Sequence, residues 1–228
     1  MSNFIITIDG PAASGKSTAA RLLAQKLGAG FLDTGAMYRA VTLAAMLDSV
    51  DLAKEEKLVE VIENHKFNFE PQNDQTVVYI DGHDATKVIR EQDVTANARY
   101  IAAAPGVREK LVQMQRQFAA QHKIIVTEGR DQGTAAFPDA QVKFFLTAQP
   151  NERARRRLVE LMAEGKKESL SQIQEAIEKR DRSDIERDAG PLKPAPDAIE
   201  IDTTNLDIEQ VVDKLFSYAD EIIKGTCK

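Results

Sequence analysis

The sequence lacks several features that define common protein classes. Cys227 is the only cysteine among the 228 residues, so one chain can form neither an internal disulfide nor a thiolate metal site. Basic residues are not in excess, because 30 Lys and Arg stand against 36 Asp and Glu and leave a formal net charge of −6. Binding to nucleic acid normally needs a basic face, so we expect no nucleic-acid partner.

Long apolar segments are also missing. No apolar run approaches the roughly 18 residues that suggest a membrane span, and the segment "FIITIDG" lacks the basic start and apolar core of a signal peptide. We therefore expect a cytoplasmic protein with no membrane partner. No long exposed apolar face requires a second copy of the chain, so we also expect a monomer.

Short apolar runs alternate with amphipathic stretches along the chain. "FIITI" from Phe4, "KIIVTEG" from Lys123 and "VKFFLTA" from Val142 are typical of strands buried on both faces of a parallel sheet, and "DAIEIDTT" from Asp197 is a weaker example. Helical periodicity covers 16–27, 105–121 and 207–223. This alternation predicts an α/β fold with a doubly wound parallel sheet, in a single unit over residues 1–228.

Two segments depart from the alternation. Between about 62 and 92, Phe67 and Phe69 alternate with polar residues while "PQND" and "DG" mark turns, which predicts a small antiparallel insert. Between about 150 and 170, four arginines crowd into one predicted helix that ends at "EGKKES", before another helix over 170–184. These arginines are Arg153, Arg155, Arg156 and Arg157.

The segment "IDGPAASGKST" satisfies the phosphate-binding pattern GxxxxGK[ST], with a buried strand before it and an amphipathic helix after it. Its backbone N–H groups and the positive end of the helix dipole can point at one anion. We expect Lys16 to reach the β and γ phosphates of ATP and Ser17 to supply a hydroxyl to Mg²⁺. The predicted ATP-binding residues are Gly10, Pro11, Ala12, Ala13, Ser14, Gly15, Lys16, Ser17 and Thr18.

This loop occurs in GTPases, ATPases and small-molecule kinases, so it does not name the reaction. The chain contains no [NT]KxD motif for reading guanine, which weakens the GTPase interpretation. Instead, "FLDTGAMYRA" places Thr34, Tyr38 and Arg39 after a short strand that ends in Asp33, where they suit an anionic ligand that carries a ring. Simple packing of Tyr38 and solvation of Arg39 is the alternative.

Two further charged groups follow in the sequence. "TEGRDQGT" places Arg130 and Asp131 at the carboxyl edge of the predicted sheet, where ligands of doubly wound proteins bind. Arg180, Asp184 and Arg187 recur at i, i+4 and i+7, so they share one helical face. A structural ion pair for the first group and a solvated salt-bridge ladder for the second remain as alternatives.

The order and spacing of these motifs resemble the bacterial cytidylate kinases, nucleoside monophosphate (NMP) kinases that phosphorylate CMP and dCMP. The matching segments are "GPAASGKS", "DTGAMYR", "PGVR", "GRDQGT", "ERARRR" and "RDRSDIER", which span nearly the whole chain. The resemblance implies a P-loop NTPase-type fold in which the antiparallel segment is an NMP-binding insert and the arginine-rich helix belongs to a lid. It also implies ATP and CMP or dCMP as substrates and Mg²⁺ as cofactor.

The resemblance further implies roles for single residues. Those expected to hold the acceptor nucleotide are Thr34, Tyr38, Arg39, Arg108, Arg130, Asp131, Arg180, Asp184 and Arg187, with Arg108 and Asp131 at the cytosine edge. The lid arginines over the ATP phosphates are Arg153, Arg156 and Arg157. The residues expected to act in catalysis are Lys16, Arg39, Arg130, Arg153, Arg157 and Arg180.

Two positions depart from the family pattern. A serine that often contributes to base recognition stands nine residues before the "PxVR" arginine in the family, and Arg99 occupies that place here. Glu128 stands where some members have an aspartate beside the metal. The preference among CMP, dCMP and UMP and the role of Glu128 therefore stay open.

The implied reaction is an in-line transfer between two phosphates, which needs no strong base because the accepting oxygen is already anionic. One alternative is a P-loop kinase that acts on a metabolite hydroxyl, such as a shikimate-like kinase, with Asp33 as the base. Another is a P-loop protein that binds nucleotide as a regulatory or assembly module.

Overall fold

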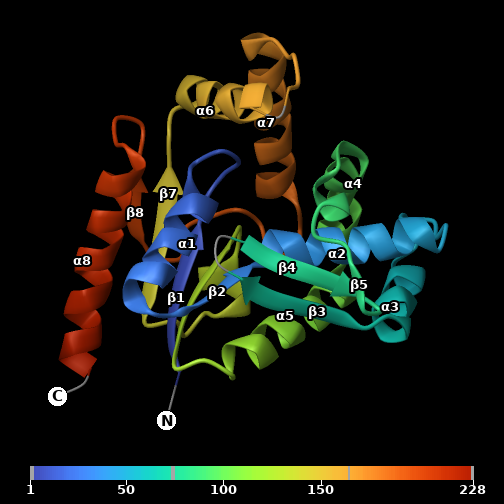
Figure 1. Cartoon of the computed structure of the whole chain (residues 1–228), viewed down its shortest axis with the longest axis horizontal. Coiled ribbons are helices and arrows are strands. Elements are labelled where there is room, and N and C mark those ends of the chain that lie inside the picture. Colours follow the sequence, from blue (N-terminus) through green and yellow to red (C-terminus); the bar gives the residue numbers. More distant parts are fainter. Residues whose placement is uncertain (1–2, 73–74, 164, 227–228) are drawn as a thin grey trace.

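The computed structural model describes residues 3–72, 75–163 and 165–226 and contains two sheets with helices around them (Figure 1). The larger sheet has the order β2-β6-β1-β7-β8, and every pair of neighbours is parallel. Its strands are β1 (Phe4–Asp9), β2 (Gly30–Asp33), β6 (Ile124–Gly129), β7 (Val142–Thr147) and β8 (Ile199–Asp202). The predicted doubly wound α/β fold is thereby confirmed.

Helices cover both faces of this sheet. On one face α1 (Lys16–Leu27) and α8 (Ile208–Thr226) pack through residues such as Leu23 and Leu215, and on the other α2 (Thr34–Leu47) and α5 (Pro105–Ala119) pack through Met37 and others. Ile125 and Val126 of β6 belong to different apolar clusters, because successive side chains of a strand point to opposite faces. Burial on both faces explains why the strands lack polar alternation.

The predicted antiparallel insert is a three-stranded sheet in the order β3-β4-β5. Its strands are β3 (Phe67–Gln72), β4 (Gln75–Ile80) and β5 (His83–Asp84). Helices α3 (Glu55–Asn64) and α4 (Gln92–Ala103) and the short η1 (Val88–Arg90) border the sheet and were not predicted. Only Val94 and Ile101 of α4 are buried, so its apolar period is weak in the sequence.

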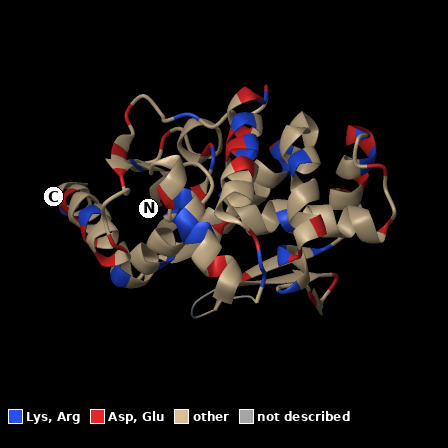
Figure 2. Cartoon of the chain, turned by 90° about the horizontal axis from the view of Figure 1, so that it is seen from above, with Lys and Arg blue, Asp and Glu red and all other residues tan. Residues whose placement is uncertain are grey.

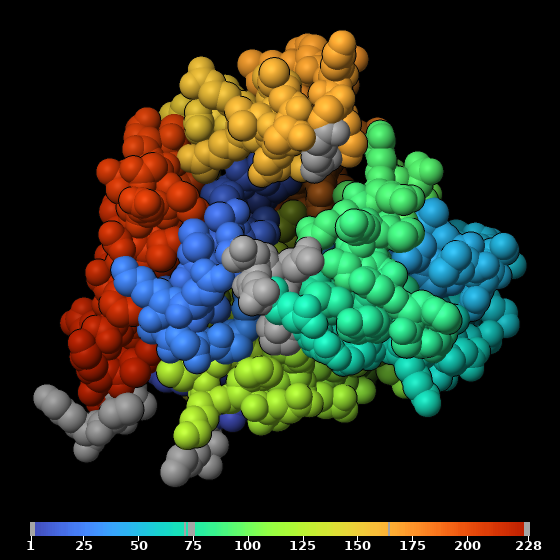
Figure 3. Space-filling model, in the orientation of Figure 1, coloured from blue at the N-terminus to red at the C-terminus, as the bar shows by residue number. Residues whose placement is uncertain are grey.

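The arginine-rich segment forms one arm of a helical hairpin. It consists of α6 (Pro150–Ala163) and α7 (Leu170–Glu186), and Ser169 and Gln172 form a capping box that starts α7. The hairpin packs on Ala12 of the β1–α1 loop through Ala154, Ile173 and Ile177. It lies beyond the carboxyl edge of the parallel sheet, and Figure 3 shows the surface hollowed between the hairpin, the N-terminal segment and the insert.

The last element is η2 (Gln132–Ala136), a single π-helical turn between β6 and β7. Charges of both signs are interspersed over the helices seen from above, so that view shows no continuous basic face (Figure 2). Among the described residues, no helix is both long enough and apolar enough to cross a bilayer.

Candidate active site

The loop between β1 and α1, together with the first three residues of α1, is here called the phosphate loop (residues 10–18), and two glycines shape it. Gly10 has φ +153° and Gly15 has φ +86°, values that are costly for residues with a Cβ atom. A Cβ on Gly10 would overlap the carbonyl oxygen of Leu146, so only glycine lets the loop run against β7. Helix α1 follows directly and presents its first N–H groups and positive dipole end. This backbone shape suits a phosphate.

Lys16 is buried at the first position of α1. Only 5% of the residue is exposed, and its Nζ donates to the carbonyl oxygen of Pro11 at 3.1 Å. Burial, followed by the positive charge of Arg130, lowers the pKa of Lys16 to about 7, although Glu128 opposes the shift. An anion beside Lys16 would favour its charged form, so phosphate binding and protonation of Lys16 reinforce each other.

A cavity of about 220 Å³ opens beside the start of α1. Its lining joins the phosphate loop to the ends of β2 and β6, to α2 and to the insert. The lining residues are Ser17, Thr18, Arg21, Phe31, Asp33, Arg39, Thr76, Arg90 and Glu128. The cavity therefore brings the predicted ATP and acceptor residues Ser17 and Arg39 into one space.

Ser17 and Glu128 form the part of this cavity that suits a divalent cation. Ser17 Oγ donates to Glu128 Oε1 at 2.9 Å, and the carboxylate of Asp33 lines the same cavity. Burial and then the charge of Asp33 raise the pKa of Glu128, so a nearby cation would stabilise its ionised form. No three Asp, Glu, His or Cys residues of the described chain converge as a metal cage. This oxygen set fits Mg²⁺, which keeps several waters and takes its other ligands from phosphates.

Asp33 caps α2 and pairs with two arginines. Its Oδ1 accepts from the N–H of Ala36 at 2.8 Å, while Oδ2 lies 3.4 Å from Arg39 Nη2 and 3.6 Å from Arg90 Nη2. Burial alone would raise the pKa of Asp33, but Arg39, Arg90 and the capped N–H together lower it below its usual value. Such a carboxylate is a weak base. Arg39 Nε is buried and has no hydrogen-bond partner among the described residues, so it can donate to an incoming anion.

Five predicted residues form an ion-pair cluster that consists of Arg108, Arg130, Asp131, Asp184 and Arg187. Arg108 Nη2 contacts Asp131 Oδ2, and Arg130 Nε donates to Asp184 Oδ2 at 2.8 Å. Arg187 lies between the two pairs, with Nη2 at 3.7 Å from Asp131 Oδ1 and Nη1 at 3.7 Å from Asp184 Oδ1. The side chains of Asp184 and Arg187 are 15% and 10% exposed, which does not fit a solvated ladder on a helix surface.

The two carboxylates of the cluster differ in how fully they are compensated. Burial raises the pKa of Asp131, although Arg108 and Arg187 oppose it. For Asp184, burial acts in the raising direction, but the charge and hydrogen bond of Arg130, together with the charges of Arg180 and Arg187, lower the pKa of this carboxyl. The surroundings therefore stabilise the ionised form of Asp184 more than that of Asp131.

Tyr38 and Gly190 enclose the Arg108 side of the cluster. The Tyr38 ring centroid lies 5.8 Å from Arg108 Cζ, and burial raises the pKa of Tyr38 to about 12, so its hydroxyl stays protonated. Arg187 Nε donates to the carbonyl oxygen of Gly190 at 2.7 Å, which holds the loop after α7 over the cluster. Gly190 has φ +60°, and a Cβ there would overlap Arg108 and Asp131.

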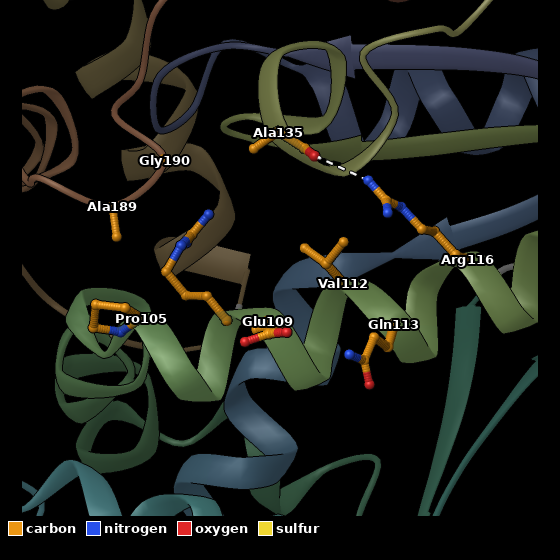
Figure 4. Close-up of a pocket in the computed structure, with 9 residues that line it drawn as sticks. Pro105, Glu109, Val112, Gln113, Arg116, Ala135, Ala189 and Gly190 are labelled. Carbon is orange, nitrogen blue, oxygen red and sulfur yellow. Dashed lines mark hydrogen bonds between the residues drawn. The ribbon is translucent and has the colours of Figure 1, made fainter.

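A second cavity of about 340 Å³ opens beside Arg108 (Figure 4). It lies between α5, the turn η2 and the loop at Gly190, and Arg116 closes one end by donating to the carbonyl oxygen of Ala135 at 3.4 Å. None of the predicted phosphate-loop residues lines it.

Three further predicted residues lie at the edges of these groups. Arg180 is exposed by surface area, but the protein around its guanidinium partly desolvates the charge. This desolvation and then the charge of Arg130 lower the pKa of Arg180 to about 10, so it is still charged at neutral pH. Thr34 is buried and donates from Oγ1 to the carbonyl oxygen of Glu128 at 2.7 Å, which ties α2 to β6. Arg99 is exposed on α4 and its Nη2 donates to the Tyr100 hydroxyl at 3.2 Å, with no contact to the cluster.

The lid arginines do not act as a group in this structure. Arg153 is buried, contacts Asp181 and donates from Nη1 to the carbonyl oxygen of Ala12 at 3.1 Å. Arg156 donates to the Thr203 carbonyl oxygen at 2.6 Å, whereas Arg157 pairs with Glu160 at 2.8 Å. Arg153 and Arg156 therefore fasten the hairpin to the body of the protein, and Arg157 stays on its surface.

Sequence reasoning missed three charged residues that the structure places around the phosphate loop. Arg90 reaches the cavity from the insert, Asp181 accepts from the N–H of Ala12 at 3.0 Å, and Asp9 accepts from the N–H groups of η2. Asp9 and Asp181 lie within or beside the recognised motifs "IDGPAASGKST" and "RDRSDIER", but the groups that they contact are distant in the sequence. Arg90 lies in a segment with no recognised motif.

The phosphate loop, the parallel sheet and the arginines at its carboxyl edge together define a P-loop protein of the kinase type. The sequence profile described as "Cytidylate kinase" matches residues 6–221, and the chain belongs to the cytidylate kinase family. It is 45% identical over 212 residues to the cytidylate kinase of Bacillus cereus (strain ATCC 10987 / NRS 248), covering 93% of this chain and 94% of that one. It is also 45% identical over 210 residues to the cytidylate kinase of Bacillus thuringiensis (strain Al Hakam), covering 92% and 93%.

Among solved structures, an uncharacterized protein from Eubacterium ventriosum ATCC 27560 is similar in fold alone. It aligns with a TM-score of 0.53 at 12% identity and covers 96% of this chain and 99% of its own.

Proposed function

We propose that the protein transfers the γ-phosphoryl group of ATP to the phosphate of CMP or dCMP, with Mg²⁺, and forms ADP with CDP or dCDP. The observation that carries this proposal is the ion-pair cluster, because a kinase for a simple metabolite has little use for it. Arg108 and Asp131 offer a guanidinium and a carboxylate, which complement the ring acceptors and the amino group of cytosine.

The proposed chemistry rests on alignment and charge. Lys16 is buried within the phosphate loop, and the charges of Arg130, Glu128, Arg180 and Asp184 all contribute to its pKa after burial, so Lys16 lies within electrostatic reach of the acceptor residues. Arg39, Arg130 and Arg180 would hold the acceptor phosphate against the repulsion of the donor phosphates. Mg²⁺ beside Ser17 and Glu128 would neutralise charge on the transferring group.

Arg157 is the lid residue that closure would bring to the phosphates. Its side chain is 40% exposed and pairs with Glu160, whereas Arg153 would act through the backbone of the phosphate loop that it holds. Closure over both nucleotides would exclude water as the competing acceptor. We accordingly propose that residues from about 62 to 92 form the antiparallel part of the NMP-binding insert and that residues from about 150 to 170 form the lid of a single kinase unit. We also propose that the protein works as a monomer in the cytoplasm.

The rival reaction, phosphorylation of a hydroxyl, needs a general base. Asp33 was the candidate, but it caps α2, pairs with Arg39 and Arg90, and has a pKa held below its usual value. These contacts favour a phosphate as the acceptor, because an anionic oxygen needs no base.

A coupled assay of ADP release tests the proposal with CMP, dCMP, UMP, AMP, GMP and shikimate as acceptors. We expect turnover that depends on CMP or dCMP and little ATP hydrolysis without an acceptor. Turnover with shikimate alone would establish the hydroxyl kinase, and ATP binding without any acceptor-dependent turnover would establish a regulatory module. Substantial ATP hydrolysis in the absence of a nucleoside monophosphate would contradict the proposed lid.

A further inference from the structure

Asp9 is a buried carboxylate that the proposed chemistry does not use. It ends β1 directly before Gly10 and is 4% exposed. Its Oδ1 accepts from the N–H of Gln132 and its Oδ2 from the N–H of Gly133, both at 2.8 Å. Each oxygen thus has one backbone donor, and both donors belong to the turn η2 that follows Asp131.

The first N–H groups of any helical turn lack acceptors within the turn. An aspartate at the N-cap position usually accepts a hydrogen bond from one of them. Asp131 occupies the N-cap position of η2, yet its side chain makes no capping bond. Its carboxylate is committed instead to Arg108 and Arg187. Asp9 accepts hydrogen bonds from the two N–H groups that the Asp131 side chain does not cap.

We propose that Asp9 caps η2 from the neighbouring strand and so frees the Asp131 carboxylate to face Arg108 and the base of the acceptor nucleotide. Asp9 is then a positioning residue for base selection, and this role rests on the proposed function. Without Asp9, the Asp131 carboxylate, which stands at the N-cap position of η2, would turn from Arg108 to cap its own turn.

The backbone hydrogen bonds of η2 limit the expected change to the side chain of Asp131. The carbonyl oxygen of Asp131 accepts from the N–H of Ala135 at 2.8 Å, so the turn stays attached to the backbone of Asp131 whatever the side chain does. The N–H groups of Gln132 and Gly133 are held by Asp9 alone among the described contacts. Loss of Asp9 should therefore redirect the Asp131 side chain rather than dissolve the turn.

The test compares Asp9→Asn with a matched control, Thr7→Val. Asparagine keeps one acceptor oxygen and replaces the other with an amide donor, which would face an N–H group. Thr7 is the neighbouring buried polar residue on the same face of β1, and its Oγ1 has no hydrogen-bond partner among the described residues. The two changes disturb the same strand, but only Asp9→Asn breaks the bonds to η2.

For Asp9→Asn we expect the ratio of kcat/KM for CMP to that for AMP to fall at least about tenfold, the size of one hydrogen bond to a charged group. The Kd for ATP should change less than twofold, and Thr7→Val should change neither quantity. In a double-mutant cycle with Asp131→Ala, Asp9→Asn should lower the ratio no further, because both act through one carboxylate. An equal loss of kcat/KM for CMP and AMP, or additive effects in the cycle, would overturn the proposal.

Amide hydrogen exchange provides a readout that does not depend on the reaction. Exchange at Gln132 and Gly133 should be at least about tenfold faster in Asp9→Asn than in the native protein, whereas exchange at Ala135 should stay protected. Unchanged exchange at Gln132 and Gly133 would refute capping by Asp9, even if the enzyme proved active. If exchange is faster in Asp9→Asn but the native protein shows no turnover on any nucleoside monophosphate, the cap is upheld and the proposed function is contradicted.

Discussion

The phosphate loop and the ion-pair cluster are two parts of the candidate site, and they are built in different ways. The loop is one contiguous segment that uses backbone N–H groups, so its requirements are conformations and close approaches, as at Gly10. The cluster uses side chains from α5, the end of β6 and α7, so its requirements are complementary charges. A site made of backbone is therefore sensitive to a single methyl group, and a site made of side chains is sensitive to the loss of any one partner.

Arg180→Ala should have the largest effect, because it removes one exposed charge without breaking a described ion pair. We expect kcat to fall by about three decades with every acceptor, the size of effect that arginine fingers have on phosphoryl transfer in GTPases. Asp131→Ala should behave differently and mainly lower the preference among bases. Steady-state kinetics with CMP, UMP and AMP measure both, and equal losses across the bases for Asp131→Ala would contradict the base-reading role that we propose for it.

Gly10→Ala should lower kcat/KM for ATP by about two decades, since displacing the loop by about 1 Å spoils its alignment. Gly28→Ala is the matched control, because Gly28 also has a positive φ, +61°, but a Cβ there meets nothing within 4 Å. It should cost about 1 kcal/mol of stability and leave ATP binding unchanged. Nucleotide titration and thermal unfolding of both variants provide the comparison, and normal ATP binding by Gly10→Ala would show that the loop is not built as described.

Gly190→Ala carries the same test to the ion-pair cluster. A Cβ at Gly190 would overlap Arg108 and Asp131, so these side chains must separate or the loop must lift. We expect about a tenfold loss of kcat/KM for CMP, equivalent to one charged hydrogen bond, with KM for ATP unchanged. An effect on ATP as large as that on CMP would mean that the two regions are not independent.

His65, in the insert, should have the smallest effect. Its Nδ1 lies 2.5 Å from Asp81 Oδ2 and its Nε2 lies 2.9 Å from Asp48 Oδ2, and only the protonated ring can donate to both. These hydrogen bonds, with Asp48 first, raise the pKa of His65 above 6.5. The raised pKa means that the stabilisation is complete below pH 6.5 and is lost as pH rises through the pKa of the folded protein.

The measurement is denaturant unfolding of the native protein and of His65→Gln between pH 5 and 9. The difference should be at most about 1 kcal/mol at low pH, because solvent reaches the pair, and should vanish at high pH. A difference that grew with pH would show that His65 is held in its neutral form.

The sequence predicted the elements whose signals are local. The conformations of β1, β6, β7 and the phosphate loop depend on residues a few positions apart, so apolar runs and the pattern GxxxxGK[ST] predict them. Helix α1 likewise spans the predicted residues 16–27. Helix α4 was missed because only Val94 and Ile101 of it are buried, and β5 because two residues carry no alternation. Family resemblance, rather than spacing, brought Arg108 into the predicted site.

Only the tertiary structure decided which charges meet. The chain has 30 basic and 36 acidic residues, so very many ion pairs are possible. No local pattern predicts that Arg153 pairs with Asp181, or that Asp9 holds the turn after Asp131. Such pairs form between segments that the sheet brings side by side, and their strength depends on burial, which only the folded chain determines. The sequence by itself therefore determined the fold class and the phosphate loop, while the packing of β1, β6 and α7 decided that Asp9 holds the turn η2 and that Asp131 contacts Arg108.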